Sequence, residues 1–392
     1  MKYAPVTARL AGLGSEKWVL NSAAHARRKA GLEVINLTIG EPDVPPPPML
    51  LDTACEAMRA GRTGYSNGRG ETELLAALSE RYSAQLGRAI GQDRFLCLPG
   101  TQTALYLAFM ALCEPGTEVI VGDPMYATYE GLIRASGADM VPVTLKPDAN
   151  FRLQSSDIAE KITPRTRAIF LNTPHNPTGA ILTPEDLHTI AALARRHDLW
   201  IVSDEVYGNL THDGAPFVSA LADPEFEARV IVSASISKSH AAPGFRSGWL
   251  CAPAEFCTHA LPLSETMLFG SQPFIADMTA AALRAPFDLA RGMATRMAHR
   301  ATLIHAALDG HAGLRVHKPQ AGMFALIDIR ALSSDSQAFA LALLEATGVA
   351  VMPGASFGAG LEGWLRVALN APDDVTALAC RKIACFATEW TT

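Results

Sequence analysis

The feature that most constrains this chain is a regular alternation of two hydrophobic periods through its middle. Short apolar runs rich in β-branched residues are typical of strands buried on both faces of a sheet. Amphipathic helical segments lie between several of them; one follows Thr183, which begins a capping pattern. This alternation predicts an α/β fold with a mainly parallel central sheet wrapped by helices. The predicted strands are EVIVGD (118–123), RAIFLN (167–172), LWIVSD (199–204), VIVSAS (230–235) and SGWLCA (247–252).

The last third of the chain has a different pattern. A helical stretch runs from about Phe287 to Gly310, and three strand candidates follow: MFALIDI (323–329), VAVMPG (349–354) and WLRVAL (364–369). A length of 392 residues suits two domains better than one. We therefore predict a large domain over residues 45–285 and a smaller, discontinuous α/β domain made of residues 1–44 and 286–392.

Composition excludes several classes of function. The formal charge is −6, and no basic stripe offers the electrostatic attraction that nucleic-acid binding needs. Seven cysteines without a C-x-x-C pair argue against a zinc cluster or a disulfide framework. No run approaches the roughly 18 apolar residues of a membrane span, and the N-terminus lacks the apolar core of a signal peptide. We expect a cytoplasmic protein.

Polar residues follow the predicted strands at the points where the strands end. Ligands of open α/β sheets bind at the carboxyl ends of parallel strands, so these residues are candidates for one shared site. Asn176 follows RAIFLNTP, while Asp204 ends LWIVSD and Tyr207 comes three residues later. VIVSAS leads to Ser235, Lys238 and Arg246, and RFLCLP leads to Gly100, Thr101 and Gln102 at the start of a helical pattern.

The chemistry of this set points to one cofactor. A helix N-terminus with hydroxyls and an arginine suits a phosphate. A buried carboxylate suits a protonated pyridine nitrogen, a phenol and an amide suit a ring hydroxyl, and a lysine can form a Schiff base. The combination predicts pyridoxal 5′-phosphate and no metal.

Seven motifs also carry a family resemblance. They are YSNGRGETEL, LPGTQTAL, DPMYATYE, NTPHNPTGA, SDEVYGNL, SISKSHAAPGFRSGW and a late arginine, Arg366. In combination they resemble the class I/II aminotransferases, enzymes of pyridoxal-phosphate fold type I. The resemblance extends from INLTIGEPD (35–43) to GWLRVAL (363–369), and it implies that fold and a ping-pong transfer of an amino group.

The resemblance implies a role for each matching residue. Lys238 is the implied Schiff-base lysine and acid/base, and Asp204 the partner of the pyridinium nitrogen. Asn176 and Tyr207 would bind the ring oxygen, and Tyr126 would stack on the ring. The phosphate would be held by the helix start at Gly100 and by Thr101, Gln102, Ser235 and Arg246, with Tyr65 of a neighbouring subunit. That implies a homodimer with shared sites. Gly40, Asn176 and Arg366 would bind the substrate carboxylate.

The substrate is less constrained than the cofactor. SISKSHAAPGFRSGW, MLFGSQPFIADM and GMFALIDIR resemble the arginine:pyruvate transaminases, which implies arginine or another long amino acid as donor and a 2-oxo acid such as pyruvate as acceptor. A cationic donor needs an acidic pocket group, for which Glu16 and Glu41 are candidates. Two alternatives stay open: a lyase or decarboxylase that uses the same cofactor, and an aminotransferase-like sensor domain. The sensor would need a DNA-binding domain, for which the resemblance leaves no room.

Each candidate also has an ordinary structural explanation. A lone Lys238 could be a surface lysine, Asp204 a helix cap, and Tyr65 or Tyr126 simple packing. An arginine inside an apolar strand, however, needs a partner, so Arg366 favours function. The G-x-G-x-x-G at 358–363 does not open a helix after a strand, and we interpret it as a loop.

Overall fold

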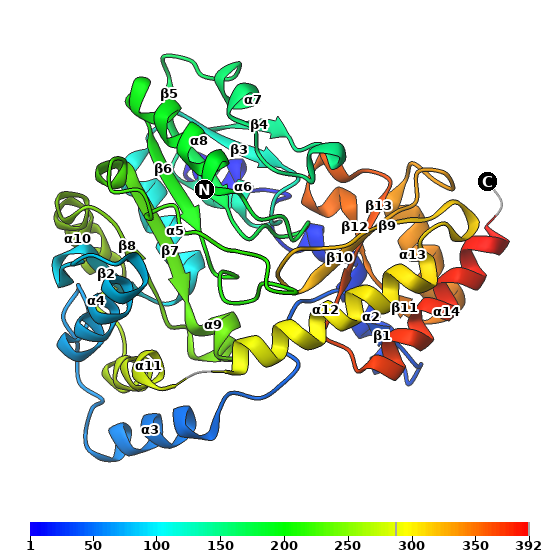
Figure 1. Ribbon diagram of the computed structural model, residues 1–392, viewed down its shortest axis with the longest axis horizontal. Helices are drawn as coiled ribbons and strands as arrows, with labels where there is room; N and C mark the ends of the chain where they lie inside the picture. Colours follow the sequence, from blue (N-terminus) through cyan, green and yellow to red (C-terminus); the bar gives the residue numbers. More distant parts are fainter. Residues whose placement is uncertain (287, 391–392) are drawn as a thin grey trace.

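The computed structural model describes residues 1–286 and 288–390, without the side chains of residues 15 and 16. Its largest element is a seven-stranded sheet in the order β2-β8-β7-β6-β5-β3-β4 (Figure 1). Its strands are β2 (Phe95–Leu98), β3 (Glu118–Asp123), β4 (Asp139–Thr144), β5 (Thr166–Asn172), β6 (Trp200–Asp204), β7 (Val230–Ser235) and β8 (Gly248–Cys251).

All neighbouring pairs of this sheet are parallel except those that β8 makes with β2 and β7. Reversing one strand between two others leaves β2 and β7 pointing the same way. The carboxyl ends of β2, β5, β6 and β7 therefore lie along one edge, which gathers the polar residues that follow them.

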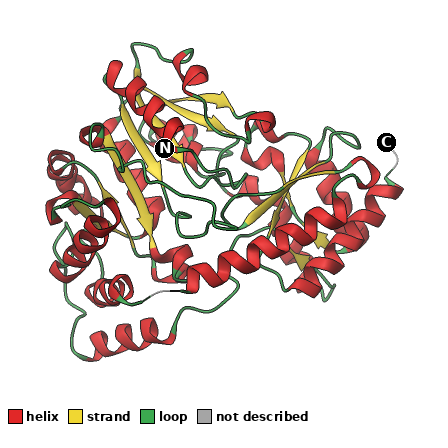
Figure 2. Ribbon diagram, viewed as in Figure 1, coloured by secondary structure: helices red, strands yellow, loops and turns green. Residues whose placement is uncertain are grey.

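Helices cover both faces of the sheet (Figure 2). Successive side chains of a strand point to opposite faces, and accordingly Leu96 and Val202 belong to one buried cluster, whereas Phe95 and Ile201 belong to the other. The helices around this sheet are α3 (Pro48–Arg59), α4 (Thr72–Leu86), α5 (Gly100–Leu112), α6 (Tyr129–Ala135), α7 (Ser155–Ala159), α8 (Pro184–Arg196), α9 (Ile236–Ser239), α10 (Ala254–Leu268) and α11 (Pro273–Arg284). Helix α8 starts with the predicted cap, a capping box between Thr183 and Asp186.

The rest of the chain forms two smaller sheets. A four-stranded antiparallel sheet has the order β12-β13-β10-β9, and β1 (Ile35–Asn36) pairs in parallel with β11 (Val349–Ala350). The other strands are β9 (Arg315–His317), β10 (Phe324–Asp328), β12 (Met352–Pro353) and β13 (Trp364–Ala368), and the helices are α1 (Pro5–Arg9), α2 (Val19–Lys29), α12 (Leu289–Leu308), α13 (Ser336–Thr347) and α14 (Asp373–Glu389).

One predicted strand is wrong as a single element. Residues 349–354 form two short strands, β11 and β12, which belong to different sheets because the chain passes from one sheet to the other at Val351. The predicted long helix is α12, although Phe287 at its expected start lies outside the described residues. The G-x-G-x-x-G segment forms a short 3-10 turn (Ala359–Leu361) before β13, as expected for a loop.

Helix α12 runs from the large sheet to the smaller ones (Figure 1). It packs against α9 at one end and against β9, β10 and α14 along its length. No helix among the described residues is long and apolar enough to cross a membrane. All seven cysteines are free thiols.

Candidate active site

A cavity of about 350 Å³ opens where the carboxyl ends of the large sheet face the smaller sheets. Its wall includes Asp204 at the end of β6, Asn176 after β5, Lys238 on α9 after β7, and Thr101 and Gln102 at the start of α5. Most of the predicted site residues line it: Gly40, Thr101, Gln102, Tyr126, Asn176, Asp204, Tyr207, Lys238, Arg246 and Arg366.

Lys238 lies on the short helix α9, directly after β7. Its Nζ donates a hydrogen bond of 2.7 Å to the carbonyl of Gly40, which comes from the N-terminal part of the chain. Burial lowers the pKa of Lys238 to about 8, and the nearby charges of Arg366 and Arg246 act in the same direction, while Glu41 and Asp204 oppose it. A lysine of this kind is neutral in a larger fraction of molecules near neutral pH than an exposed one, and the neutral amine is the nucleophile.

Asp204 ends β6, and its buried side chain lines the cavity. Burial raises its pKa to about 6, although hydrogen bonds from Tyr129 and from the backbone of Val206 act against the rise. The Tyr129 hydroxyl donates to Asp204 Oδ2 at 2.8 Å, and the Val206 N–H donates to Oδ1 at 3.1 Å. Such a carboxylate is suited to hold a cationic N–H group.

The start of α5 offers backbone donors next to an arginine. Gly100 has a φ of +82°, and a Cβ at this position would meet Arg246 Nη2 at 2.4 Å, so glycine keeps this space open. Within the described part of the chain, Arg246 donates hydrogen bonds only to the carbonyls of Pro243 and Pro99. No carboxylate of the described residues lies within ion-pair distance of Arg246. Free N–H groups of a helix start beside a guanidinium suit a phosphate.

Arg366 is a buried arginine to which the described part of the chain supplies no counter-ion. It lies on β13 and is 1% exposed, and its guanidinium carbon lies 3.8 Å from the ring centre of Phe324 and 4.2 Å from that of Phe357. Its Nη1 donates to Asn176 Oδ1 at 3.1 Å and its Nη2 to the Thr38 carbonyl at 2.6 Å, while Nε has no partner. Burial lowers the pKa of Arg366 to about 10, so it keeps its charge at neutral pH.

An uncompensated buried cation is costly. The described residues supply no carboxylate to Arg366, and the guanidinium faces the cavity that also contains Lys238. A small anion bound in this cavity would therefore stabilise the site. The planar fork of arginine matches the two oxygens of a carboxylate.

Three predicted residues do not line the cavity. Tyr65 is 91% exposed and its ring packs edge-on against Phe269, so its place is at the surface of this chain. Ser235 lines a different hollow, and its Oγ accepts a hydrogen bond from the Ser237 N–H at the start of α9. Gly100 contributes the open space beside Arg246 described above.

Other residues complete the wall without having been predicted to do so. Tyr129 contacts Asp204 directly; it begins α6, three residues after Tyr126 of the preceding loop, and its presence in the same DPMYATYE motif was the available signal. Trp18 packs edge-on to Tyr126, with ring centres 6.4 Å apart, and Phe324 covers Arg366. Glu41 lines the cavity as predicted for an acidic pocket group, whereas the side chain of Glu16 lies outside the described part of the chain. The described residues contain no cluster of metal-ligating side chains.

Known proteins resemble this chain along nearly its whole length. The sequence profile described as aminotransferase class I and II matches residues 33–383. An arginine–pyruvate transaminase of Pseudomonas aeruginosa is 40% identical over 389 residues, which cover 99% of each chain. An aspartate/prephenate aminotransferase of Thermus thermophilus is 33% identical over 87% of this chain and 88% of its own.

Solved structures show the same likeness. The aspartate aminotransferase of Thermus thermophilus with maleate superposes with a TM-score of 0.91 and 29% identity, covering 98% of this chain and 100% of its own. That of Rhizobium meliloti superposes with a TM-score of 0.93 and 26% identity, covering both chains completely.

Proposed function

Because this chain belongs to the class I and II aminotransferases, and is therefore a pyridoxal-phosphate-dependent transaminase, we propose that it takes the amino group of a long, basic L-amino acid and passes it to a small 2-oxo acid such as pyruvate. The relative that is 40% identical acts, by its name, on arginine and pyruvate. The observation that carries the proposal is the buried guanidinium of Arg366, to which the described residues supply no carboxylate, in the same cavity as the amine of Lys238.

The residues of the cavity fit pyridoxal phosphate. The open space at Gly100 suits its phosphate, as does Arg246, which has no carboxylate partner among the described residues. The buried Asp204 suits its ring nitrogen. Asn176 and Tyr207 offer an amide and a phenol for the ring oxygen, and Tyr126 offers a ring face. When bound, the cofactor supplies a ring that accepts the electron pair left when the Cα proton of the substrate departs.

Lys238 and Asp204 carry out complementary tasks in this proposal. The Asp204 carboxylate would hold the proton on the ring nitrogen, and Tyr129 keeps that carboxylate oriented through its 2.8 Å hydrogen bond. Lys238 would hold the cofactor through its Nζ between reactions and, once the substrate has taken its place, would accept the Cα proton of the substrate on that amine. A general base works best when its pKa lies near the operating pH, and a lysine pKa of about 8 meets that condition.

The substrate carboxylate would bind beside the hydrogen-bonded pair of Arg366 and Asn176. Both oxygens could accept from the guanidinium fork, which would supply the missing counter-ion and give Nε a partner. Because every α-amino acid and every 2-oxo acid carries this carboxylate, one site would serve both halves of a ping-pong cycle.

The position of Glu41 supports the proposal that the amino donor has a cationic side chain. It is an exposed carboxylate at the cavity wall, directly after Gly40, and the described residues offer it no ion-pair partner. A guanidinium or ammonium group at the end of a long donor would pair with it, whereas an acidic donor would be repelled.

A donor panel tests this proposal. We expect arginine and other basic amino acids to react faster with pyruvate than acidic, aromatic or aliphatic donors do, and Glu41→Gln to reduce kcat/KM for arginine by about tenfold, a loss of about 1.4 kcal/mol, with little change for an uncharged donor. Asp52→Asn, an exposed acid on α3, is the control. A flat profile that Glu41→Gln leaves unchanged would contradict the proposed donor.

The lyase alternative gives a different product balance. A transaminase forms one molecule of alanine for each molecule of donor consumed with pyruvate, whereas a lyase or decarboxylase consumes donor without forming alanine. Lys238→Ala should abolish turnover. A Lys238→Ala enzyme that keeps its activity would contradict both the transaminase and the lyase function.

The quaternary structure and the location of the protein belong to the same proposal. Tyr65 and Phe269 form an exposed aromatic pair beside a hollow of about 340 Å³, which supports a homodimer in which Tyr65 completes the partner's phosphate site. The free thiols support a reducing cytoplasm. We also propose that residues 1–44 and 286–392 close on residues 45–285 when the carboxylate binds Arg366.

A further inference from the structure

The segment from Leu37 to Asp43 passes along the wall of the active-site cavity without helix or strand structure. Three of its carbonyls accept hydrogen bonds from side chains of other elements. The Thr38 carbonyl accepts from Arg366 at 2.6 Å, that of Ile39 from Asn370 at 3.0 Å, and that of Gly40 from Lys238 at 2.7 Å. A shift of this segment would therefore move both Lys238 and Arg366, the two charged side chains that the proposed function places next to the substrate.

The far end of the segment is fixed by an ion cluster on α12. Arg296 donates to both oxygens of Asp43, at 2.7 and 2.8 Å, and Arg300 Nη1 donates to Asp43 Oδ2 at 2.8 Å. The two arginines are one helical turn apart and so lie on one face of α12. The side chain of Asp43 is 5% exposed and that of Arg300 is 7% exposed, so water competes little for these bonds.

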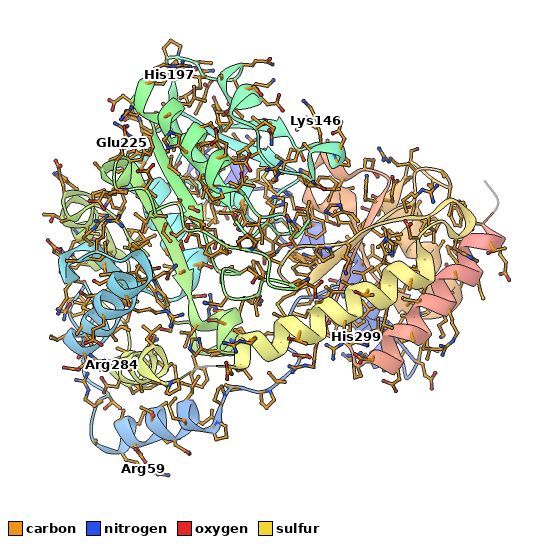
Figure 3. All side chains as sticks on the ribbon, viewed as in Figure 1. Arg59, Lys146, His197, Glu225, Arg284 and His299 are labelled. Carbon is orange, nitrogen blue, oxygen red and sulfur yellow. The ribbon has the colours of Figure 1, made fainter. Side chains whose placement is uncertain are left out.

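Arg300 also reaches the strand that carries Arg366. Its Nη1 donates to the Leu369 carbonyl at 3.0 Å, just after the end of β13, and its Nε donates to Asp373 at 2.9 Å. His299, labelled in Figure 3, is the preceding residue and marks this part of α12; it lies 3.5 Å from the other Asp373 oxygen. One guanidinium thus links the segment before α3 to the strand of Arg366.

The ionisation state of Asp43 also favours this cluster. Burial by itself would raise the pKa of Asp43, but the hydrogen bonds and charges of Arg296 and Arg300 outweigh it, and the pKa is lowered. Asp43 is therefore ionised throughout the physiological range. A carboxylate with three charge-assisted bonds in a nearly dry site holds its geometry well.

We infer that Arg296 and Arg300 are positioning residues for the proposed transamination: by holding Asp43 they fix the Leu37–Asp43 segment against Lys238 and Arg366. Neither arginine lines the cavity, so they act through the segment. Because α12 also packs against α9, which carries Lys238, and against β10, which carries Phe324, the segment is fastened to the same helix that supports both walls of the site. This inference rests on the proposed function for its catalytic consequence but not for its structural one.

The test uses the holoenzyme and the substitutions Arg300→Gln and Asp43→Asn. We expect KM for the amino donor to rise by about tenfold or more, since charged contacts to the carboxylate lose their alignment, while kcat falls less and the cofactor content stays at the wild-type level. Hydrogen exchange of the peptide 34–48 should become faster. Arg300→Lys, which keeps the charge but loses the fork, should recover part of both effects.

Arg291→Gln is the matched control. Arg291 lies on the same helix, is largely exposed and forms an ion pair with Asp288, so its loss should leave KM and the exchange of 34–48 unchanged. If Arg300→Gln does not fold, Arg296→Gln takes its place, because the Arg296 side chain is 38% exposed and its loss is better tolerated. Folded variants with wild-type exchange at 34–48 and wild-type KM would overturn the inference.

The two proposals can fail separately. The exchange measurement needs no substrate, so it tests the cluster even if no basic donor reacts. KM is measured with whichever donor the wild-type enzyme prefers, so a wrong donor assignment leaves the comparison intact. Faster exchange with an unchanged KM would show that the cluster is structural only, and that also contradicts the inference.

Discussion

The guanidinium of Arg366 is the single side chain on which substrate binding depends most in this proposal. Arg366→Lys keeps a positive charge but loses the planar fork and the stacking between Phe324 and Phe357. We expect KM to rise about 10- to 150-fold for both the donor and the 2-oxo acid, which corresponds to about 1.5–3 kcal/mol for a hydrogen bond to a charged group.

Steady-state kinetics with varied donor and with varied 2-oxo acid measure KM for both half-reactions. Arg330→Lys is the control, because Arg330 lies just beyond β10, is half exposed and pairs with Asp328 at the surface. A normal KM for Arg366→Lys with either substrate would show that the carboxylate binds elsewhere.

Lys238 allows a prediction on pH dependence. Its folded pKa of about 8 is below the ordinary lysine value, so the neutral, reactive amine is present above pH 8 and disappears as the pH falls through that value. In protein freed of cofactor, we expect the rate at which an amine-reactive reagent labels Lys238 to rise with pH with a midpoint near pH 8. Mass spectrometry measures this rate. Exposed lysines, with an ordinary pKa of about 10.4, are the internal standard, and a midpoint shared with them would refute the shift.

At the scale of one element, the start of α5 is the part most sensitive to a single methyl group. A Cβ on Gly100 would meet Arg246 Nη2 at 2.4 Å, and the φ of +82° adds backbone strain. We expect Gly100→Ala to weaken cofactor binding by about tenfold or more, since strain of this kind costs about 1–3 kcal/mol. The affinity is measured as the cofactor concentration that restores half of the activity.

The matched control is Gly131→Ala in α6. Gly131 has open space around its Cβ position and a helical backbone, so alanine should leave cofactor binding unchanged and stabilise the fold by about 0.5–1 kcal/mol. Equal effects of the two substitutions would mean that the space at Gly100 has no special role.

At the scale of the whole molecule, the exposed pair of Tyr65 and Phe269 is the reason why we expect a homodimer. Phe269 is 64% exposed, and large exposed aromatic side chains mark interaction surfaces more often than free surface. We expect the wild-type protein to sediment as a dimer and Phe269→Glu to shift it towards monomers with weaker cofactor retention, because the Tyr65 of the second copy is lost.

Leu378→Glu serves as the control for this experiment, since Leu378 is an exposed apolar residue on α14. A fully active wild-type monomer would rule out shared sites.

The sequence by itself determined the α/β class, most strand positions, the cofactor chemistry and the family. The physical reason is that burial on two faces imposes a local apolar pattern, and that strand ends of a parallel sheet gather at one edge whatever the loops do. Lys238, Asp204 and Asn176 could thus be assigned to one place from their distance to a preceding strand. The boundary within 349–354 could not be predicted, because a change of sheet leaves an apolar run unbroken.

Only the tertiary structure decided how the N-terminal segment takes part. The bond from Lys238 to the Gly40 carbonyl joins positions 198 residues apart, and the cluster of Asp43 with Arg300 joins positions 257 apart. The stacking of Arg366 between two phenylalanines and the bond from Tyr129 to Asp204 are likewise contacts between distant elements. No local period encodes such contacts, because they depend on how complete sheets and helices pack against each other.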